Sequence, residues 1–346
     1  MALQGLFRGI YGVSKLERKP FFETGKLQPF KLQKIILDRI GNNKSAIGPS
    51  VGTDFGLTDS GLIMTTDPLS CHRPLGMEFA AKFGFSIILT DFLASGNTPE
   101  FMSVSLQLPA TMTDEELEKY WESFTREAKK WEIDLVTGHT GRYPSASFPL
   151  IGSCTMVGRA VKEPMNYNKV SEGDSILIMG FPGIQASVIL SFYGKGRDME
   201  LMGNLKEMKE NLIITQPMKS LIDNFAPHIR VMHDVTEGGL NSSLFEIARA
   251  SSREIRVEKN KIPSHKIINQ YLSSLELDPF SVTSEGCIVL ITEKDVSEDI
   301  MNFIIKLGYP CSIAGHVGGK GDNHAFIDNK VLGEPGSDPY WGAILK

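Results

Sequence analysis

The chain has 346 residues, of which 41% are hydrophobic and 22% charged, and its formal net charge is -5. This composition is typical of a folded protein with a sizeable core, and the length favours two domains over one. The acidic balance, the lack of a long basic run and the lack of an apolar run of roughly 18 residues argue against nucleic-acid or membrane partners. Its four cysteines are scattered without a CxxC pair, so we expect a cytoplasmic protein without disulfides or a zinc site.

Residues 1–45 are expected to form an extension ahead of the first domain. Within it, "KLQPFKLQKIILDRIG" predicts a short helix that ends at Gly41. Its apolar residues share one face and need a covering surface, for which the chain's own domain is the simplest candidate. The residues of this face are Leu32, Ile35, Ile36 and Ile40.

The next part of the chain, residues 46–162, alternates predicted strands with predicted helices. The clearest helix follows Thr113, because Thr113 and Glu116 have the spacing of a capping box and apolar residues then recur at helical spacing. A very apolar helix precedes it and is broken by Gly96 and Pro99. The predicted strands are 62–66, 103–110, 134–141 and 148–160.

A polar, aperiodic linker over residues 161–173 separates this part from a second domain, 163–346, which again mixes both kinds of element. Two such halves predict a two-domain α+β protein. The predicted strands of the second half are 175–180, 229–234 and 287–292, and the predicted helices are 184–194, 205–227 (interrupted by a proline), 240–251 and 296–308.

Four aspartates, Asp54, Asp67, Asp91 and Asp234, recur beside Gly or Thr at the end of an apolar element. Asp67 and Asp234 are expected to end strands, and Asp91 to lie near the end of the apolar helix. A buried carboxylate is costly unless it is paired or bound to a cation, and such oxygens suit Mg²⁺. The alternative for each aspartate alone is a helix cap or a turn.

The stretch "HDVTEGGL", residues 233–240, places polar groups between a strand and a helix. Asp234 is expected to end the strand, and the glycine pair of the following turn would let the backbone approach a ligand. The N-terminus of the helix favours a phosphate, so a cation and a phosphate side by side describe a magnesium–nucleotide site. The alternatives are a plain N-cap turn and, for His233, a hydrogen-bonded core histidine.

These motifs resemble the aminoimidazole ribonucleotide synthase-related (PurM-like) superfamily, and most closely its HypE-like branch. The stretches "TTDP", "GHT" and "HDVTEGG" occur there in this order, and the resemblance covers residues of about 45 to 325. It implies a first domain whose strands pair with those of a second subunit in a dimeric barrel, and a second domain that forms an α/β sandwich. It also implies ATP and Mg²⁺ in a cleft lined by acidic residues.

Carried over by position, the resemblance makes Asp54, Asp67 and Asp91 metal ligands. Asp234 and His139 become candidate catalytic residues. The candidate nucleotide-binding residues are Thr66, Gly138, Thr140, Thr236, Gly238 and Gly239.

Departures from the family pattern bear on the activity. Thr53 stands where many relatives have a second acid, His139 stands where many have Asp, and Glu285 lies in a site of small residues. HypE acts through a C-terminal tail that ends in Cys, whereas this sequence ends "PYWGAILK", so we expect a different acceptor.

The leading hypothesis is therefore an ATP- and Mg²⁺-dependent homodimeric enzyme that phosphorylates an oxygen of an unassigned small-molecule or protein-borne acceptor. The alternatives are a catalytically silent ATP-binding regulator or maturation scaffold, and a phosphohydrolase in which His139 activates water.

Overall fold

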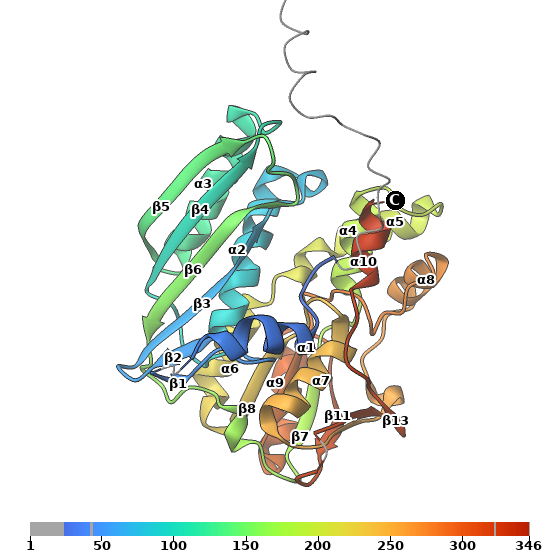
Figure 1. The fold of residues 1–346 in the computed structure, drawn as a ribbon. Helices are drawn as coiled ribbons and strands as arrows, with labels where there is room; N and C mark the ends of the chain where they lie inside the picture. The colour runs from blue at the N-terminus through green and yellow to red at the C-terminus, as the bar shows by residue number, and fades with distance from the viewer. Residues whose placement is uncertain (1–23, 42–43, 322, 346) are drawn as a thin grey trace, which may run out of the picture.

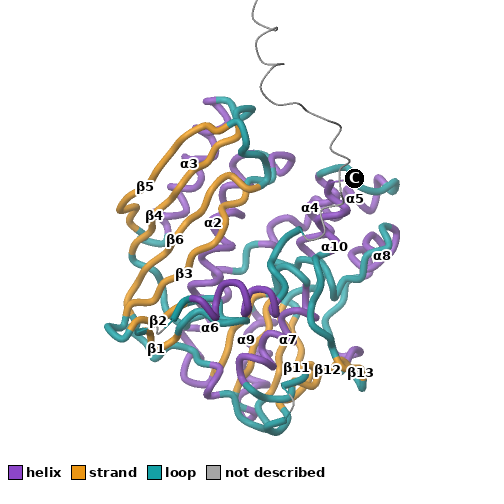
Figure 2. The backbone as a smooth tube through the Cα atoms, in the orientation of Figure 1, coloured by secondary structure: helices purple, strands orange, loops and turns teal. Residues whose placement is uncertain are grey.

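The computed structural model describes residues 24–41, 44–321 and 323–345. It contains two β-sheets, each packed against helices, which confirms the predicted two-domain α+β architecture (Figure 1; Figure 2). The first sheet ends in sequence at Arg159 and the second begins at Ser175. The predicted domain boundary falls between these two residues and stays a prediction, as does the limit of the N-terminal extension. None of the helices in the described ranges combines the length and the apolar character needed to cross a membrane.

The first sheet has the strand order β1-β2-β3-β6-β4-β5. Neighbouring strands are antiparallel except β4 and β5, which run parallel. Helices α2 (Met77–Leu93) and α3 (Asp114–Lys130) cover one face of this sheet (Figure 1). The strands are β1 (Ser45–Ile47), β2 (Gly56–Thr58), β3 (Leu62–Ser70), β4 (Phe101–Pro109), β5 (Asp134–Tyr143) and β6 (Leu150–Arg159).

The capping box predicted for α3 is confirmed. The Thr113 side chain accepts a hydrogen bond from the Glu116 N–H at 3.2 Å, and the Glu116 carboxylate accepts one from the Thr113 N–H at 2.9 Å. Arg73 donates two further hydrogen bonds to the same carboxylate. The start of α3 is therefore fixed by side chains as well as by its apolar face.

Strand β3 illustrates how the sheet separates its two faces. Ile63 and Thr65 are buried on the helix side, whereas Met64 and Thr66 are exposed on the outer side. Side chains alternate along a strand, so Asp67 points to the helix side. The prediction that Asp67 ends the strand is wrong, because β3 continues to Ser70.

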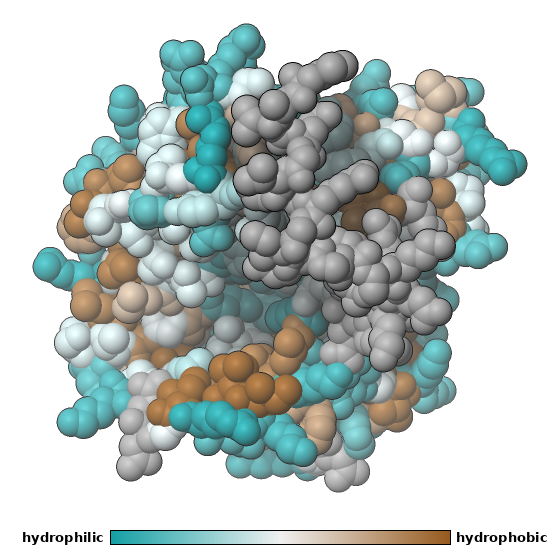
Figure 3. Space-filling view, turned by 45° about the horizontal axis from the view of Figure 1, so that its top comes forward, coloured by the Kyte–Doolittle hydropathy of each residue, from teal (hydrophilic) through white to brown (hydrophobic). Residues whose placement is uncertain are grey.

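The outer side of this first sheet stays uncovered in the single chain. Every residue of β5 is exposed or half-buried, which is unusual for a strand that contains Leu135 and Val136. The exposed large apolar side chains of its strands are Leu62, Met64, Phe101, Leu135, Val136, Tyr143 and Leu150. Figure 3 shows how apolar patches of this kind interrupt a mostly polar surface.

The second sheet has the order β13-β12-β9-β11-β7-β10-β8 and is covered on both faces. Strands β7 and β10 are buried throughout, and alternate residues enter two different cores. Leu177 and Leu290 belong to the core shared with the first domain, whereas Ile178 and Val289 belong to the core beneath α7. The strands are β7 (Ser175–Met179), β8 (Ile229–Asp234), β9 (Ile255–Val257), β10 (Ile288–Thr292), β11 (Cys311–Val317), β12 (Ala325–Ile327) and β13 (Lys330–Val331).

Seven helices of the described chain belong to the second half. Helices α2 and α6 pack together and join the two domains, which is why one core runs through both. The seven are α4 (Ile184–Phe192), α5 (Met199–Glu207), α6 (Thr215–Phe225), α7 (Gly239–Ser251), α8 (Lys266–Ser274), α9 (Ser297–Lys306) and α10 (Pro339–Leu345).

The predicted helix of the N-terminal extension is present. It begins as α1 (Pro29–Lys31) and continues through wider and tighter turns to Arg39. Its apolar residues do not pack on the chain's own domain as expected, because Ile35 and Ile36 are each 49% exposed. The one-sided apolar pattern predicted the helix correctly, but it carried no information about what covers that side.

Candidate functional site

The four predicted aspartates converge between the two domains. Asp67 comes from β3, Asp91 from the last turn of α2, Asp234 from the end of β8, and Asp54 from the loop before β2. Burial raises the pKa of Asp91, and repulsion from Asp234, Asp67 and Asp54 raises it further, so the four carboxyl groups lie close enough to interact. The strand that ends at Asp234 and the position of Asp91 near a helix end are as predicted.

Burial and mutual repulsion keep protons on this cluster. Burial, followed by repulsion from Asp234, raises the pKa of Asp67 to about 7. Burial, followed by repulsion from Asp54, raises the pKa of Asp234 to about 6. The same causes raise the pKa of Asp91 well above its ordinary range. A bound cation would offset this repulsion and favour the ionised form of the carboxyl groups.

His233 lies inside the cluster as a charged group. Its Nδ1 is 3.0 Å from Asp54 Oδ2 and 2.9 Å from the Tyr167 hydroxyl, and its Nε2 is 3.3 Å from Glu246 Oε2. Burial alone would lower the pKa of His233, but the two carboxylates raise it to about 10. Asp54, His233 and Asp234 bring potential ligand atoms within 4.8 Å of one another. Because both ring nitrogens of His233 face polar partners, we expect its imidazolium to balance charge and the carboxylates to supply the ligands.

Two charged residues that the sequence analysis missed complete this ion network. Glu246 on α7 is buried, and Lys26 Nζ lies 3.2 Å from its Oε1. Burial would raise the pKa of Glu246, but Lys26 and His233 lower it to about 2. Glu246 was predictable only as a member of the α7 face, and Lys26 lies far from it in sequence, so no local pattern joins them.

Glu285, noted in the sequence as a departure, also belongs to the cluster. Its side chain is 1% exposed and accepts a hydrogen bond from Thr90 Oγ1 at 2.9 Å. Burial and repulsion from Asp234 and Asp67 raise its pKa well above the ordinary value. The charge placed among small residues is thus directed toward the aspartates.

The chemistry of these donors fits a magnesium ion. Glu285 Oε2 and Asp234 Oδ2 are buried without a hydrogen-bond partner in the described part of the chain. An unpaired buried carboxylate oxygen costs free energy that a cation removes, and Mg²⁺ prefers carboxylate oxygens. The residues that would hold the ion are Asp54, Asp67, Asp91, Asp234 and Glu285.

The turn after β8 uses its glycines for close backbone contact. Gly238 and Gly239 have φ values of +81° and +64°, and a Cβ on Gly239 would lie 2.6 Å from the Val282 carbonyl oxygen. The Gly239 N–H donates to the Thr236 carbonyl at 3.0 Å, and the Gly238 N–H donates to Asp338 Oδ2 at 2.9 Å. These N–H groups have internal acceptors in this conformation, so their role in binding a phosphate stays a prediction.

The remaining predicted residues lie apart from the cluster within one chain. His139 is exposed on β5, where its Nε2 is 2.7 Å from the Tyr143 hydroxyl, and Gly138 and Thr140 flank it. Strands β6 and β4 separate β5 from β3. Thr66 faces outward, 2.8 Å from the Thr155 hydroxyl. Within this chain these residues therefore do not contact the acidic cluster, and their predicted roles stay predictions.

Both halves of the chain match models of one protein family. The family model for the AIR synthase related protein N-terminal domain matches residues 52–160, and the model for its C-terminal domain matches residues 171–328. The chain belongs to the AIR synthase related family.

Two curated relatives that are similar to this chain have names that describe different activities. Carbamoyl dehydratase HypE of Rhizobium leguminosarum bv. viciae is 23% identical over 290 residues, which cover 81% of this chain and 77% of that protein. Thiamine-monophosphate kinase of Pyrococcus horikoshii is 23% identical over 261 residues, which cover 74% and 78%. A crystal structure of hydrogenase maturation protein HypE in complex with ATP has the same fold, with a TM-score of 0.66 and 20% identity over 92% of this chain and 98% of that one.

The two AIR synthase related models contain most of the cluster but not all of the ion network. Asp54, Asp67 and Asp91 lie within the N-terminal model, and Asp234 lies within the C-terminal model. Lys26 lies outside both, as does Asp338, which binds the turn after β8. These two contacts therefore come from residues outside the ranges that the two models match.

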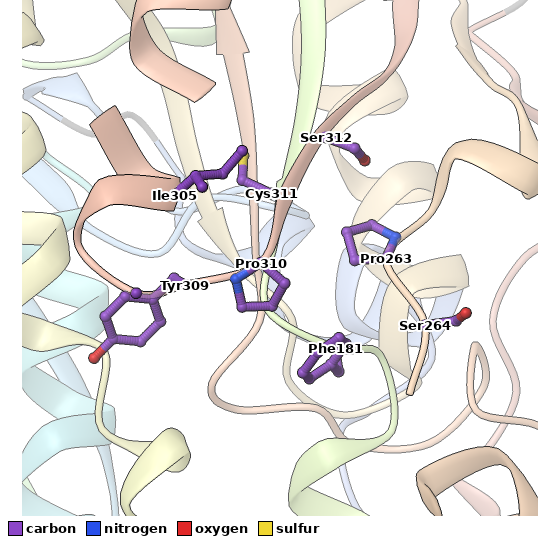
Figure 4. A pocket seen from close by; sticks show the side chains of 9 residues that line it. Phe181, Pro263, Ser264, Ile305, Tyr309, Pro310, Cys311 and Ser312 are labelled. Atoms are coloured by element: carbon purple, nitrogen blue, oxygen red, sulfur yellow. The ribbon is translucent and has the colours of Figure 1, made fainter. Parts of the chain in front are cut away.

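A separate cavity of about 490 Å³ lies at the edge of the second domain (Figure 4). Phe181, Tyr309, Pro310 and Cys311 are among its lining residues, and none of the predicted site residues lines it. Burial raises the pKa of Cys311 to about 12, so its thiol stays protonated. The lining combines aromatic rings with the hydroxyl groups of Ser264 and Ser312, and it contains no carboxylate and no basic side chain.

Proposed function

We propose that the protein binds ATP with Mg²⁺ in the acidic cluster and transfers the γ-phosphoryl group to an oxygen of an acceptor. The observation that carries this proposal is the convergence of carboxylates from both domains, two of which have buried oxygens without partners. Such a site attracts a divalent cation, and a divalent cation in turn attracts a triphosphate. The similarity to a thiamine-monophosphate kinase and to a HypE structure in complex with ATP supports the same chemistry.

In the proposed reaction the chain mainly positions charges. The metal neutralises phosphate charge when bound, and the residues that would hold it are Asp54, Asp67, Asp91, Asp234 and Glu285. The acceptor oxygen forms a bond to the γ-phosphorus while the bond to the bridging oxygen breaks, and ADP leaves with that electron pair. The proton of the acceptor passes to a base, for which Asp234 and His139 are the candidates. The acceptor, a small molecule or a protein-borne group, stays unassigned.

We further propose that the protein is a homodimer joined through its first sheet. Strand β5 and the outer side of β3 expose apolar residues that a second sheet would cover, Val136 being 65% exposed. Pairing of this kind would also bring β5 to an acidic cluster, because Gly138, His139 and Thr140 of one chain would approach the cluster of the other chain. The predicted roles of these three residues therefore depend on the dimer.

A second candidate function is nucleotide binding without turnover, in a regulator or maturation scaffold. Thr53 is the observation that favours it, because its hydroxyl donates to the Ser50 carbonyl at 3.1 Å and supplies no carboxylate. Release of ADP in the presence of candidate acceptors with carbonyl or amine groups separates the two functions. Binding without ADP release would support the regulator.

The site is tested by titration calorimetry of ATP, with and without Mg²⁺, on Asp91→Asn and Asp234→Asn. Each change keeps the shape of the side chain and removes a charge that the cluster repels. We expect both variants to lose Mg²⁺-dependent binding and to keep or gain thermal stability, since burial and repulsion raise the pKa of both carboxyl groups. Asp59→Asn, at an exposed turn, is the matched control and should bind as the wild type does.

The combination of results decides between a binding role and a structural one. Lost binding with unchanged or higher stability supports the metal site. Unchanged titrations in both variants would contradict it, and a fall in stability with retained binding would make the aspartates structural.

A further inference from the structure

We propose that two segments outside the family models hold this site closed, with Lys26 in the place of the divalent cation and Asp338 in the place of a phosphate. The first segment is residues 24–31, called the strap below, and the second is residues 334–341, called the C-terminal segment. The inference rests on the proposed function and adds a regulatory step to it, since the chain's own charges must leave before the nucleotide and its metal enter.

Lys26 binds the cluster through both oxygens of one carboxylate. Its Nζ is 3.2 Å from Glu246 Oε1 and 3.3 Å from Glu246 Oε2. It also interacts electrostatically with Asp54 and Asp234, and its side chain is 45% exposed. Glu246 Oε2 also lies 3.3 Å from His233 Nε2, so Glu246 joins two cations, the Lys26 ammonium and the His233 imidazolium, to the acidic cluster. A divalent ion competes with this ammonium for the same negative charge.

Backbone contacts fix the strap over the turn after β8. The Lys26 N–H donates to Glu237 Oε2, and the Phe30 N–H donates to Glu334 Oε1 at 2.6 Å. Gly25 has a φ of +93°, and a Cβ there would lie 2.3 Å from Glu237 Oε2 and 2.6 Å from Trp341 Nε1. The strap is thus held between the predicted nucleotide turn and the C-terminal segment.

Asp338 supplies the negative charge at the N-terminus of α7. Its Oδ2 accepts hydrogen bonds from the Gly238 N–H at 2.9 Å and the Thr283 N–H at 2.8 Å, and its Oδ1 accepts one from the Tyr340 N–H at 2.8 Å. The carboxylate is 5% exposed. An anion held by backbone N–H groups at the start of a helix is the arrangement that a phosphate adopts.

Little free space remains between these groups. A cavity of about 20 Å³ lies among Lys26, Glu237, Gly238, Glu246 and Asp338. That volume accommodates about one water molecule. A triphosphate cannot reach the Gly238 N–H while both segments stay in place.

Titration of Mn²⁺ and of ATP into the full chain tests the closure, with Lys26→Met as the principal variant. Methionine keeps the length of the side chain and removes the competing charge, so we expect Mn²⁺ to bind roughly tenfold more tightly. Lys129→Met, at an exposed position on α3, is the matched control and should bind as the wild type does. Asp338→Asn should raise the affinity for ATP in the same way, and its melting temperature reports whether the fold is kept.

Hydrogen exchange supplies a readout that does not depend on affinity. Addition of Mn²⁺ and a non-hydrolysable ATP analogue should speed exchange in the strap and in the C-terminal segment, because both must move away. Slower exchange there would overturn the proposal, as it would mean that the segments clamp onto the ligand.

The affinities separate this inference from the proposed function. Unchanged or weaker Mn²⁺ binding by Lys26→Met overturns the closure, and the proposed function stands if the wild type still binds ATP with Mg²⁺. If neither protein binds metal or nucleotide, both proposals fail.

Discussion

The two sheets of this protein resolve the same physical problem differently. In the second sheet, strands β7 and β10 are buried along their whole length, and helices cover both faces. In the first sheet, α2 and α3 cover one face, and β5 keeps no buried residue. The second sheet is complete within one chain, whereas the first has apolar surface left over. The exposed apolar surface of the first sheet is the feature on which the proposed dimer rests.

The acidic cluster draws on both regions. Asp67 and Asp91 belong to the first domain, whose sheet has an exposed face (the open half). Asp234 and Glu285 belong to the second domain, whose sheet is covered on both faces (the closed half). Helix α2 packs against α6, so the relative position of the two halves is fixed by a shared core rather than by the acids alone. The charges can then repel one another without separating the domains, because apolar packing holds them together.

The largest expected effect concerns the open sheet. Val136→Asp puts a charge at the most exposed apolar position of β5, and burying an unpaired charge in an interface is costly. We expect the variant to sediment as a monomer at concentrations where the wild type is a dimer. Ile305→Asp is the control, since Ile305 is an apolar residue of α9 in the second domain that is 49% exposed, and this variant should stay dimeric.

The outcome also bears on the cluster. If β5 reaches the site of the partner subunit, the monomeric Val136→Asp variant should lose ATP binding as well as assembly. A wild-type protein that sediments as a monomer at micromolar concentration would remove the contrast between the two sheets.

Core truncation should distinguish the sheets by their dependence on concentration. Leu290 is fully buried on β10, between β7 and β8, so Leu290→Ala should lower the free energy of unfolding by about 2–5 kcal/mol at any protein concentration. Leu135→Ala on β5 should cost stability only where the dimer forms. Urea denaturation over a dilution series measures both. A cost for Leu135→Ala that persists on dilution would show that β5 is packed within the single chain.

Much of this fold follows from local patterns in the sequence. The apolar runs predicted β7, β8 and β10, and the capping box predicted where α3 begins. The end of β3 was misplaced because the strand passes through Pro68. That proline costs little, since β2 pairs with β3 only near Met64 and the strand has just one partner by residue 68. The short strands β1, β2, β9, β12 and β13 have too few residues to show a period.

The candidate site was predictable only in part, for a related reason. Asp54, Asp67, Asp91 and Asp234 share a local context, which the sequence displays. Lys26 and Glu246 meet across 220 positions, and neither has a neighbour that marks it as special. Glu285 was visible as an unexpected charge, but its direction depends on Thr90 in the other domain. Short stretches of sequence show which residues have suitable side chains, whereas the tertiary fold determines which of them come into contact.

The charge of the cluster should appear in the pH dependence of stability. Folding raises the pKa of Asp67 to about 7 and that of Asp234 to about 6, from an ordinary value of 3.8. Between about pH 4 and 7 the folded chain therefore holds protons that the unfolded chain has released. His233 acts in the same direction, since its stabilisation is complete below pH 6.5 and is lost as the pH rises toward 10. The free energy of unfolding should fall with rising pH by about 1.4 kcal/mol per unit for each such proton.

Magnesium provides the control for this pH effect. Millimolar Mg²⁺ should flatten the fall, because a bound cation favours the ionised carboxylates of the cluster. Urea denaturation across this pH range, with Mg²⁺ or with a chelator, gives the two slopes. Equal slopes would indicate that the aspartates do not bind the ion.

The smallest expected effect concerns the helix that covers the open sheet. Thr113→Ala removes the oxygen that accepts the Glu116 N–H, and loss of such a cap lowers the free energy of unfolding by about 1 kcal/mol. Thr113→Ser keeps the oxygen, and serine is at least as good an N-cap as threonine, so this variant should be as stable as the wild type. Denaturation in urea separates the two variants. Because α3 lies on the face opposite the exposed one, the dimer should persist in both, and a dimer lost in Thr113→Ala would mean that the two faces of the first sheet are not independent.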